Sequence, residues 1–106
     1  MNQDTNRNES RLSRELLAKK LTLALIYLTS FEDSDTLNFV KAGLIDAPVT
    51  IAWKGYDFDI LNQLEEEQLI DQGKYKSKKL TLFPTGKIEA EQLVVALERA
   101  MDKEIR

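Results

Sequence analysis

The sequence predicts a mainly helical α+β domain whose only sheet element is a small β-hairpin. Apolar residues recur at helical spacing near both ends of the chain, over residues 17–31 and 90–101. Residues 79–83 alternate between polar and apolar side chains, as a strand does, and Asp71-Gln72-Gly73 is a turn signal ahead of them. Together with two shorter helices between these segments, the order is helix, helix, helix, hairpin, helix. This order is typical of a winged-helix-like fold.

The composition fits one soluble globular domain and removes several kinds of chemistry. The chain has 106 residues, of which 42% are hydrophobic and 31% charged. It contains neither cysteine nor histidine, so disulfides, thiolate metal sites, cysteine nucleophiles and the commonest general base are all excluded. We therefore expect no metal, no cofactor and no enzymatic activity.

The N-terminal end is polar. Residues 1–9 lack an apolar cluster and are predicted to form a disordered tail, which leaves residues 10–106 as the domain. No targeting segment is visible, and no apolar run approaches the roughly 20 residues that span a bilayer. The expected location is the cytoplasm, without membrane contact.

The first predicted helix begins at Ser10 or Ser13 and is apolar nearly all round. A helix of this kind is either central in its fold or shared with a second chain. Because its start, around Leu12 and Leu16, should project past the domain, we expect a homodimer that pairs there. The apolar residues that surround the helix are Leu16, Leu17, Leu21, Leu23, Leu25, Ile26 and Leu28.

The middle of the chain contains a short helix and an extended segment. Ser34 or Asp35 is predicted to cap a helix over residues 36–42, and Gly43 stands where a helix commonly ends. Residues 49–53 are rich in β-branched side chains and are predicted to form a strand or an extended lead-in.

The next helix should start at Gly55 or Asp57 and reach about residue 67, with Phe58, Leu61 and Leu64 buried.

The last elements are a hairpin and a helix. Tyr75 is a candidate for the strand that pairs with residues 79–83. Thr85 can cap a final helix that extends to about Lys103 and has an apolar face.

The stretch Trp53-Lys54-Gly55-Tyr56-Asp57-Phe58-Asp59, followed by Leu61, Leu64 and Leu69-Ile70, resembles the signature of a bacterial domain-of-unknown-function family. Leu25 to Thr29, and Leu80-Thr81-Leu82 with Gly86, match the same pattern. The resemblance covers roughly residues 20–100 and implies a small winged-helix-like protein, but it implies no activity. The chain departs from the pattern in two places. Residues 32–50 are longer than the family's link, and Gln68 stands where the family often has glycine.

Acidic residues offer no convincing catalytic or metal site. Asp57 and Asp59 are two residues apart, so they point to different faces of a helix and are better explained as helix-capping residues. Residues 33–38 begin like a calcium loop, but Leu37 and Asn38 stand at a ligand position and at the glycine position.

One basic cluster keeps a DNA-binding alternative open. Lys74, Lys76, Lys78 and Lys79 lie on the predicted hairpin, where lysines either contact phosphates or protect a sheet edge from aggregation. We favour edge protection, because the helix that would enter the major groove carries several acids and the net charge is −3.

Trp53 is either a core residue or, with Tyr56, an interaction anchor, and the core is favoured. The expected function is a protein-interaction module without enzymatic activity, which associates with itself or with another protein. The alternative is a DNA-binding winged-helix transcriptional regulator, although binding of nucleic acid is disfavoured.

Overall fold

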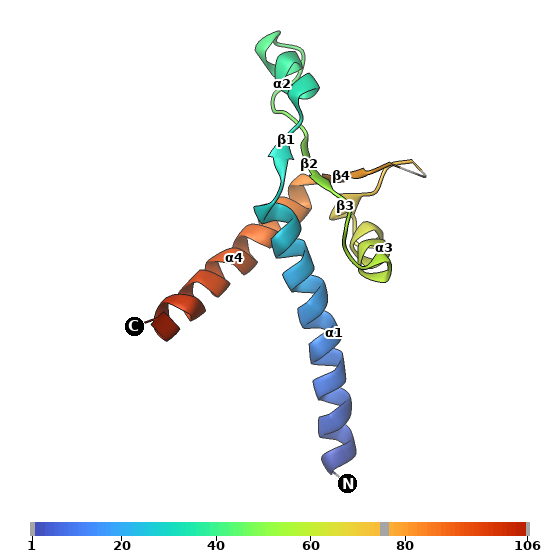
Figure 1. Ribbon diagram of the computed structural model, residues 1–106, viewed down its shortest axis with the longest axis vertical. Helices are drawn as coiled ribbons and strands as arrows, with labels where there is room; N and C mark the ends of the chain where they lie inside the picture. Colours follow the sequence, from blue (N-terminus) through green and yellow to red (C-terminus); the bar gives the residue numbers. More distant parts are fainter. Residues whose placement is uncertain (1, 75–76, 106) are drawn as a thin grey trace.

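A computed structural model describes the backbone of residues 2–74 and 77–105 and the side chains of residues 14–74 and 77–102. In these ranges the chain forms four helices and a four-stranded antiparallel sheet, which confirms the predicted α+β class (Figure 1). The elements are α1 (Asn2–Leu28), β1 (Phe31–Glu32), α2 (Ser34–Lys41), β2 (Thr50–Trp53), α3 (Phe58–Glu66), β3 (Ile70–Asp71), β4 (Lys79–Leu82) and α4 (Pro84–Ile105).

The strand order is β1-β2-β4-β3. In register, Ile51 pairs with Phe31 on one side and Thr81 on the other, and Trp53 pairs with Lys79. Directly paired residues of an antiparallel sheet point to the same face, and alternate residues point to opposite faces. One side, which we call the open face, therefore carries Phe31, Ile51, Trp53, Asp71, Lys79 and Thr81.

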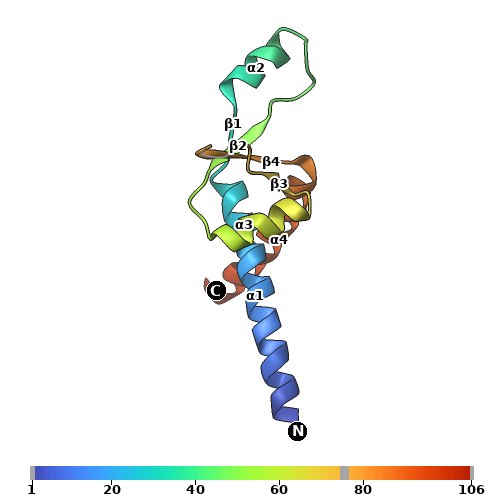
Figure 2. The ribbon, with the colours of Figure 1, turned by 90° about the vertical axis from the view of Figure 1, so that its right-hand side faces the viewer.

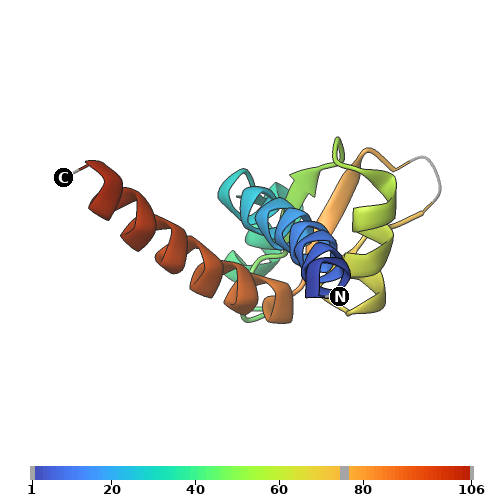
Figure 3. The same cartoon turned by 90° about the horizontal axis from the view of Figure 1, so that it is seen from below.

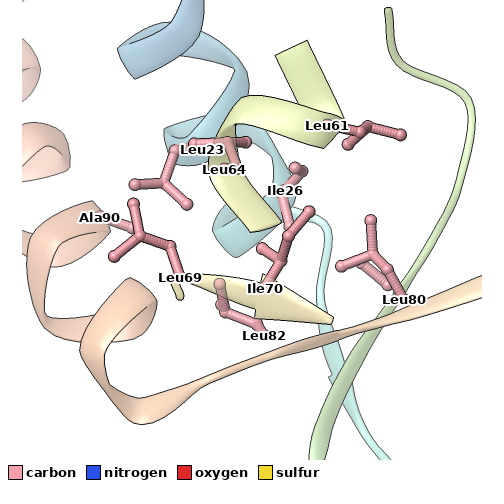
Figure 4. Packing of buried hydrophobic residues seen from close by; sticks show 10 residues of the cluster. Leu23, Ile26, Leu61, Leu64, Leu69, Ile70, Leu80, Leu82 and Ala90 are labelled. Atoms are coloured by element: carbon pink, nitrogen blue, oxygen red, sulfur yellow. The ribbon is translucent and has the colours of Figure 1, made fainter. Parts of the chain in front are cut away.

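The other face of the sheet is covered by helices. Figure 2 shows α1, α3 and α4 on one side of β4, and Figure 4 shows their side chains meeting those of the strands. The side chains that the helices and strands bury between them are aliphatic, and each is at most 8% exposed. The core consists of Leu23, Ile26, Ala52, Leu61, Leu64, Leu69, Ile70, Leu80, Leu82 and Ala90.

Helix α3 begins close to the predicted position. The side chain of Asp57 accepts a hydrogen bond from the backbone N–H of Ile60, at 3.1 Å, and so caps the helix. Leu61 and Leu64 are buried as predicted, whereas Phe58 is 69% exposed, so its predicted burial is wrong. Phe58 is the first residue of α3, and the contact of this helix with the core starts one turn later.

Helix α3 ends at a strained residue. Gln68 follows the C-cap with a φ of 61°, in the left-handed region that favours glycine. The backbone N–H of Leu69 then donates to the carbonyl of Leu64, at 3.0 Å, and closes the helix end. Gln68 is the residue at which the sequence departs from an expected glycine, and this backbone conformation is one that glycine would adopt at less cost.

Helix α4 approaches the junction between α3 and β3 very closely at Gly86. An added Cβ there would overlap the carbonyl oxygen of Leu69 and would come within 2.9 Å of Leu82 Cδ1. The hydroxyl of Thr85 donates to the carbonyl of Gln68 at 2.7 Å, so it bonds to another element and does not act as the predicted helix cap. Helix α4 instead starts at Pro84, a residue suited to the first turn because it needs no hydrogen-bond acceptor.

Helix α1 is longer than expected. It runs from Asn2, through the stretch for which the sequence predicts a disordered tail. The side chain of Leu12 lies outside the described residues, and the division of the chain into tail and domain stays a prediction. Tyr75, the candidate for the partner strand, also lies outside the described residues. In the described residues, β4 lies between β2 and β3, and β3, at residues 70–71, is the strand that precedes it in the chain.

Residues 33–49, which we call the arm, project from the sheet and contain α2 (Figures 1 and 2). None of the residues of α2 is buried. The base of the arm is held by two hydrogen bonds, from the N–H of Asp33 to the carbonyl of Val49 and from the N–H of Val49 to Thr36 Oγ1, each 2.8 Å long. Asp33, not Ser34 or Asp35, caps α2, because its carboxylate accepts from the N–H of Thr36.

The molecule is elongated. Helices α1 and α4 diverge from the sheet (Figures 1 and 3), and the arm extends beyond it on the other side (Figure 1). The radius of gyration is 16.9 Å and the extents are 62 × 40 × 20 Å. A compact domain of this length would have a radius of gyration of about 13 Å. A large share of the apolar side chains is consequently left uncovered.

Candidate functional site

The single tryptophan is a surface residue. The side chain of Trp53 is 56% exposed, so the favoured prediction of a core position is wrong. The reason is the alternation of β2, in which Ala52 takes the inward position and is fully buried. Trp53 follows it and therefore points to the open face.

Two aromatic residues and a lysine form the centre of the open face. The rings of Phe31 and Trp53 are tilted by 41° with centroids 6.0 Å apart, and Ile51 between their positions is only 7% exposed. The ammonium group of Lys79 lies 5.0 Å from the centroid of the Trp53 ring, a cation–π distance. This cluster is apolar at its centre and positive at one side.

Tyr56 does not join this cluster. It packs against the core on the helical side of the sheet, and its hydroxyl lies 3.1 Å from Thr29 Oγ1 in a hydrogen bond. The structure therefore separates the two predicted anchors, with Trp53 on the open face and Tyr56 on the inner side.

A second apolar surface lies on α1. Leu17, Leu21, Leu25 and Leu28 are all exposed, and their separations of four, four and three residues place them on one side of the helix. We call this row the leucine stripe. Leu23 and Ile26 face the core, on the other side of α1. Leu16 is also exposed, but it lies beside a small hollow that it shares with Leu64 and Leu69, off the stripe.

Polar contacts fix the side of α1 that faces the body of the protein. Lys19 bonds to Glu67 near the end of α3, and the Lys20 ammonium lies 3.7 Å from a Glu89 carboxylate oxygen of α4. The hydroxyl of Tyr27 donates to Glu91, also of α4, at 3.1 Å.

These contacts lie on the side of α1 away from the leucine stripe, so the stripe stays accessible.

Partial burial raises the pKa of Tyr27 above its ordinary value, and the Glu91 carboxylate raises it further by accepting the phenolic hydrogen and by its negative charge.

The basic hairpin borders the open face. Lys78 and Lys79 are exposed, and Lys74 lies in the turn region, whereas Lys76 lies outside the described residues. The turn carrying these lysines leaves β4 at the end where Lys79 pairs with Trp53. Lys79 and Trp53 are thus brought together, a placement that the spacing of the lysines alone did not indicate.

Other apolar residues of the arm were missed by sequence reasoning. Phe39, Leu44 and Ile45 are exposed on a segment that packs against little else. The available signal was the run of apolar residues in a stretch predicted to form a short helix and a connection.

Among the described residues, no group of acidic side chains has the arrangement that would hold a metal ion, and no helix combines the length and apolar character of a membrane span.

Comparison with known proteins identifies a family. No curated protein and no solved structure matches the chain. A family model described as "Domain of unknown function (DUF6429)" matches residues 15–100, a range that includes both the open face and the leucine stripe. Because this match covers most of the chain, the protein belongs to the DUF6429 family.

Proposed function

We propose that this chain is a protein-interaction module without enzymatic activity, and that it forms a homodimer through α1. The observation that carries the proposal is the leucine stripe, a row of four exposed leucines on the side of α1 that faces away from the core. A contiguous apolar row of this kind on a soluble protein marks an interaction surface. About half of each leucine is already covered, so burial of the remainder would contribute about 0.7–1.5 kcal/mol per side chain.

The elongated shape supports the same conclusion. The radius of gyration exceeds that of a compact domain of equal length because α1 and α4 diverge. A second copy related by a two-fold axis would present the same stripe, and two-fold pairs are the commonest closed arrangement. Leu12 and Leu16 remain candidates at the projecting end of α1, with Leu16 flanking the stripe.

The mass in solution tests this proposal. Light scattering at micromolar concentration should give a mass of at least two chains for the wild type. Leu21→Glu, in the centre of the stripe, should lower this mass, and a mass that Leu21→Glu leaves unchanged would refute pairing through α1. Glu15→Gln changes an exposed residue of the same helix outside the stripe and should leave the dimer intact. A wild-type protein with the mass of a single chain would refute the proposal.

The DNA-binding alternative is disfavoured by charge. The exposed side of α3 carries Asp59 and Glu66, with Glu67 at its C-cap, so phosphate repulsion opposes its entry into a groove. Helix α2 lies in the arm, away from α3, whereas a helix-turn-helix needs two helices packed together (Figure 1). We expect weak or no binding to random duplex DNA at physiological salt. Tight binding with a steep salt dependence would instead support the regulator.

A further inference from the structure

We propose that the open face of the sheet binds the arm of a second copy of this chain. The inference deepens the proposed self-association and rests on it for the identity of the partner, but it uses a different surface. Helices α1, α3 and α4 cover only the inner face of the sheet, so a contact on the open face leaves the leucine stripe accessible (Figures 2 and 4).

The two surfaces have complementary chemistry. The arm carries three acids, Asp33, Asp35 and Asp46, against one lysine, a formal charge of −2. The described residues beside the open face carry three lysines, Lys74, Lys78 and Lys79, against one acid, Asp71, a formal charge of +2. Apolar groups stand at the centre of each surface, with Phe39 of the arm on one side and Trp53 of the open face on the other.

The arm cannot cover the open face of its own chain as the structure stands. It leaves the sheet where Glu32 pairs with Thr50, whereas Trp53 and Lys79 lie at the opposite end of the same strands. If the strands of a second copy run in the opposite direction to those of the first, the arm of the second copy lies over Trp53 of the first. The contact is then reciprocal, as a two-fold axis requires.

The exposure of the apolar side chains in the arm agrees with a contact between two chains. Helix α2 has no buried residue, and Leu44 is 71% exposed. The hydrogen bonds between Asp33, Thr36 and Val49 nevertheless hold the arm in one orientation at its base. An apolar segment that is oriented but uncovered is pre-organised for binding, which lowers the ordering cost of the contact.

Trp53 is the only tryptophan in the chain, so its fluorescence reports directly on the open face. In the test, the reporter is Phe39→Ser, which retains Trp53 but has a defective arm. The donor is Trp53→Phe, which retains the arm and emits no tryptophan fluorescence. The matched control donor combines Trp53→Phe with Phe39→Ser. Both substituted side chains are exposed, so the core is left unchanged.

Addition of the donor should shift the reporter emission to shorter wavelength until it saturates, and the control donor should have no effect. Added salt and Lys79→Glu in the reporter should both weaken the shift, because each reduces the attraction between the lysines and the acidic arm. A reporter emission that does not respond to the donor would overturn the inference. A shift caused by single-stranded oligothymidine and not by the donor would assign the face to nucleic acid and would also overturn it.

The two proposals fail separately. If the reporter emission does not respond to the donor but Leu21→Glu still lowers the mass, only the arm contact is refuted. If the donor shifts the reporter emission but Leu21→Glu leaves the mass unchanged, only the α1 contact is refuted.

Discussion

Gly86 provides the most quantitative test of the fold, because a single added methyl group meets backbone there. In Gly86→Ala the new Cβ would overlap the carbonyl oxygen of Leu69 and crowd Leu82 Cδ1. That carbonyl already accepts the N–H of Phe83 at 3.0 Å, and the neighbouring carbonyl of Gln68 accepts the hydroxyl of Thr85. Relief of the overlap requires α4 to move away from the junction between α3 and β3, which strains both bonds.

The expected cost follows from these contacts. Overpacking of a filled interior costs about 1–3 kcal/mol, and a weakened hydrogen bond adds about 1 kcal/mol. Alanine regains up to about 1 kcal/mol from its better helix propensity. We therefore expect a net destabilisation of about 1–3 kcal/mol. At the size of this chain that loss lowers the melting temperature by roughly 5–20 °C.

Thermal and urea unfolding, followed by circular dichroism, measure this change. Gly55→Ala is the matched control, because an added Cβ at that position meets no atom within 4 Å. Its stability should stay within about 0.5 kcal/mol of the wild type. If Gly86→Ala unfolds at the same temperature as Gly55→Ala, the close approach of α4 to Leu69 is not a feature of the folded protein.

Three further substitutions probe other parts of the structure. Trp53→Ala should cost only about 1–2 kcal/mol in urea unfolding, because more than half of the side chain is already exposed, and a loss of about 3–5 kcal/mol would return Trp53 to the core. Gln68→Gly should stabilise the protein by about 0.5–1 kcal/mol, since glycine tolerates the φ of 61° at less cost, and a destabilised variant would contradict this backbone conformation. Glu91→Gln should lower the pKa of Tyr27 towards its usual value, measured by phenolate absorbance against Tyr27→Phe. Because the pKa of Tyr27 is raised, the folded protein holds the phenolic proton more tightly than the unfolded chain does. The protonated tyrosine therefore contributes to the free energy of unfolding below the ordinary tyrosine pKa, and this contribution is lost as the pH rises through the folded-state pKa. An unchanged titration in Glu91→Gln would exclude the carboxylate as a cause.

Local patterns predicted the elements whose sequence and burial agree. Leu61 and Leu64 follow helical spacing and are buried, and Leu80 and Leu82 alternate with polar residues and face the core. Gly43, predicted to end a helix, adopts a φ of 78° just after α2. In these segments one periodicity decides both the type of element and the side that is buried.

The prediction failed where the burial of a residue depends on distant partners. Trp53 is large and apolar, but the register of β2 with β4 gives the inward position to Ala52. The strands β1 and β3 have only two residues each, too few for a visible alternation. The exposed part of the candidate site consists of Phe31, Trp53 and Lys79, which lie on three different strands. These residues are far apart in the sequence, so no local pattern predicts that they meet.

The closure of the arm at its base has an evolutionary consequence. Because Asp33 and Val49 are joined by a backbone hydrogen bond, the chain enters and leaves the arm at neighbouring points. A short turn between these two residues would preserve β1, β2 and the whole core, since α2 contributes no buried residue to it. Insertion or loss of residues in the arm is therefore nearly neutral for folding. Folding of the domain therefore places little constraint on the arm beyond the contacts of Asp33, Thr36 and Val49 at its base, and selection on the rest of the segment would act through what it binds.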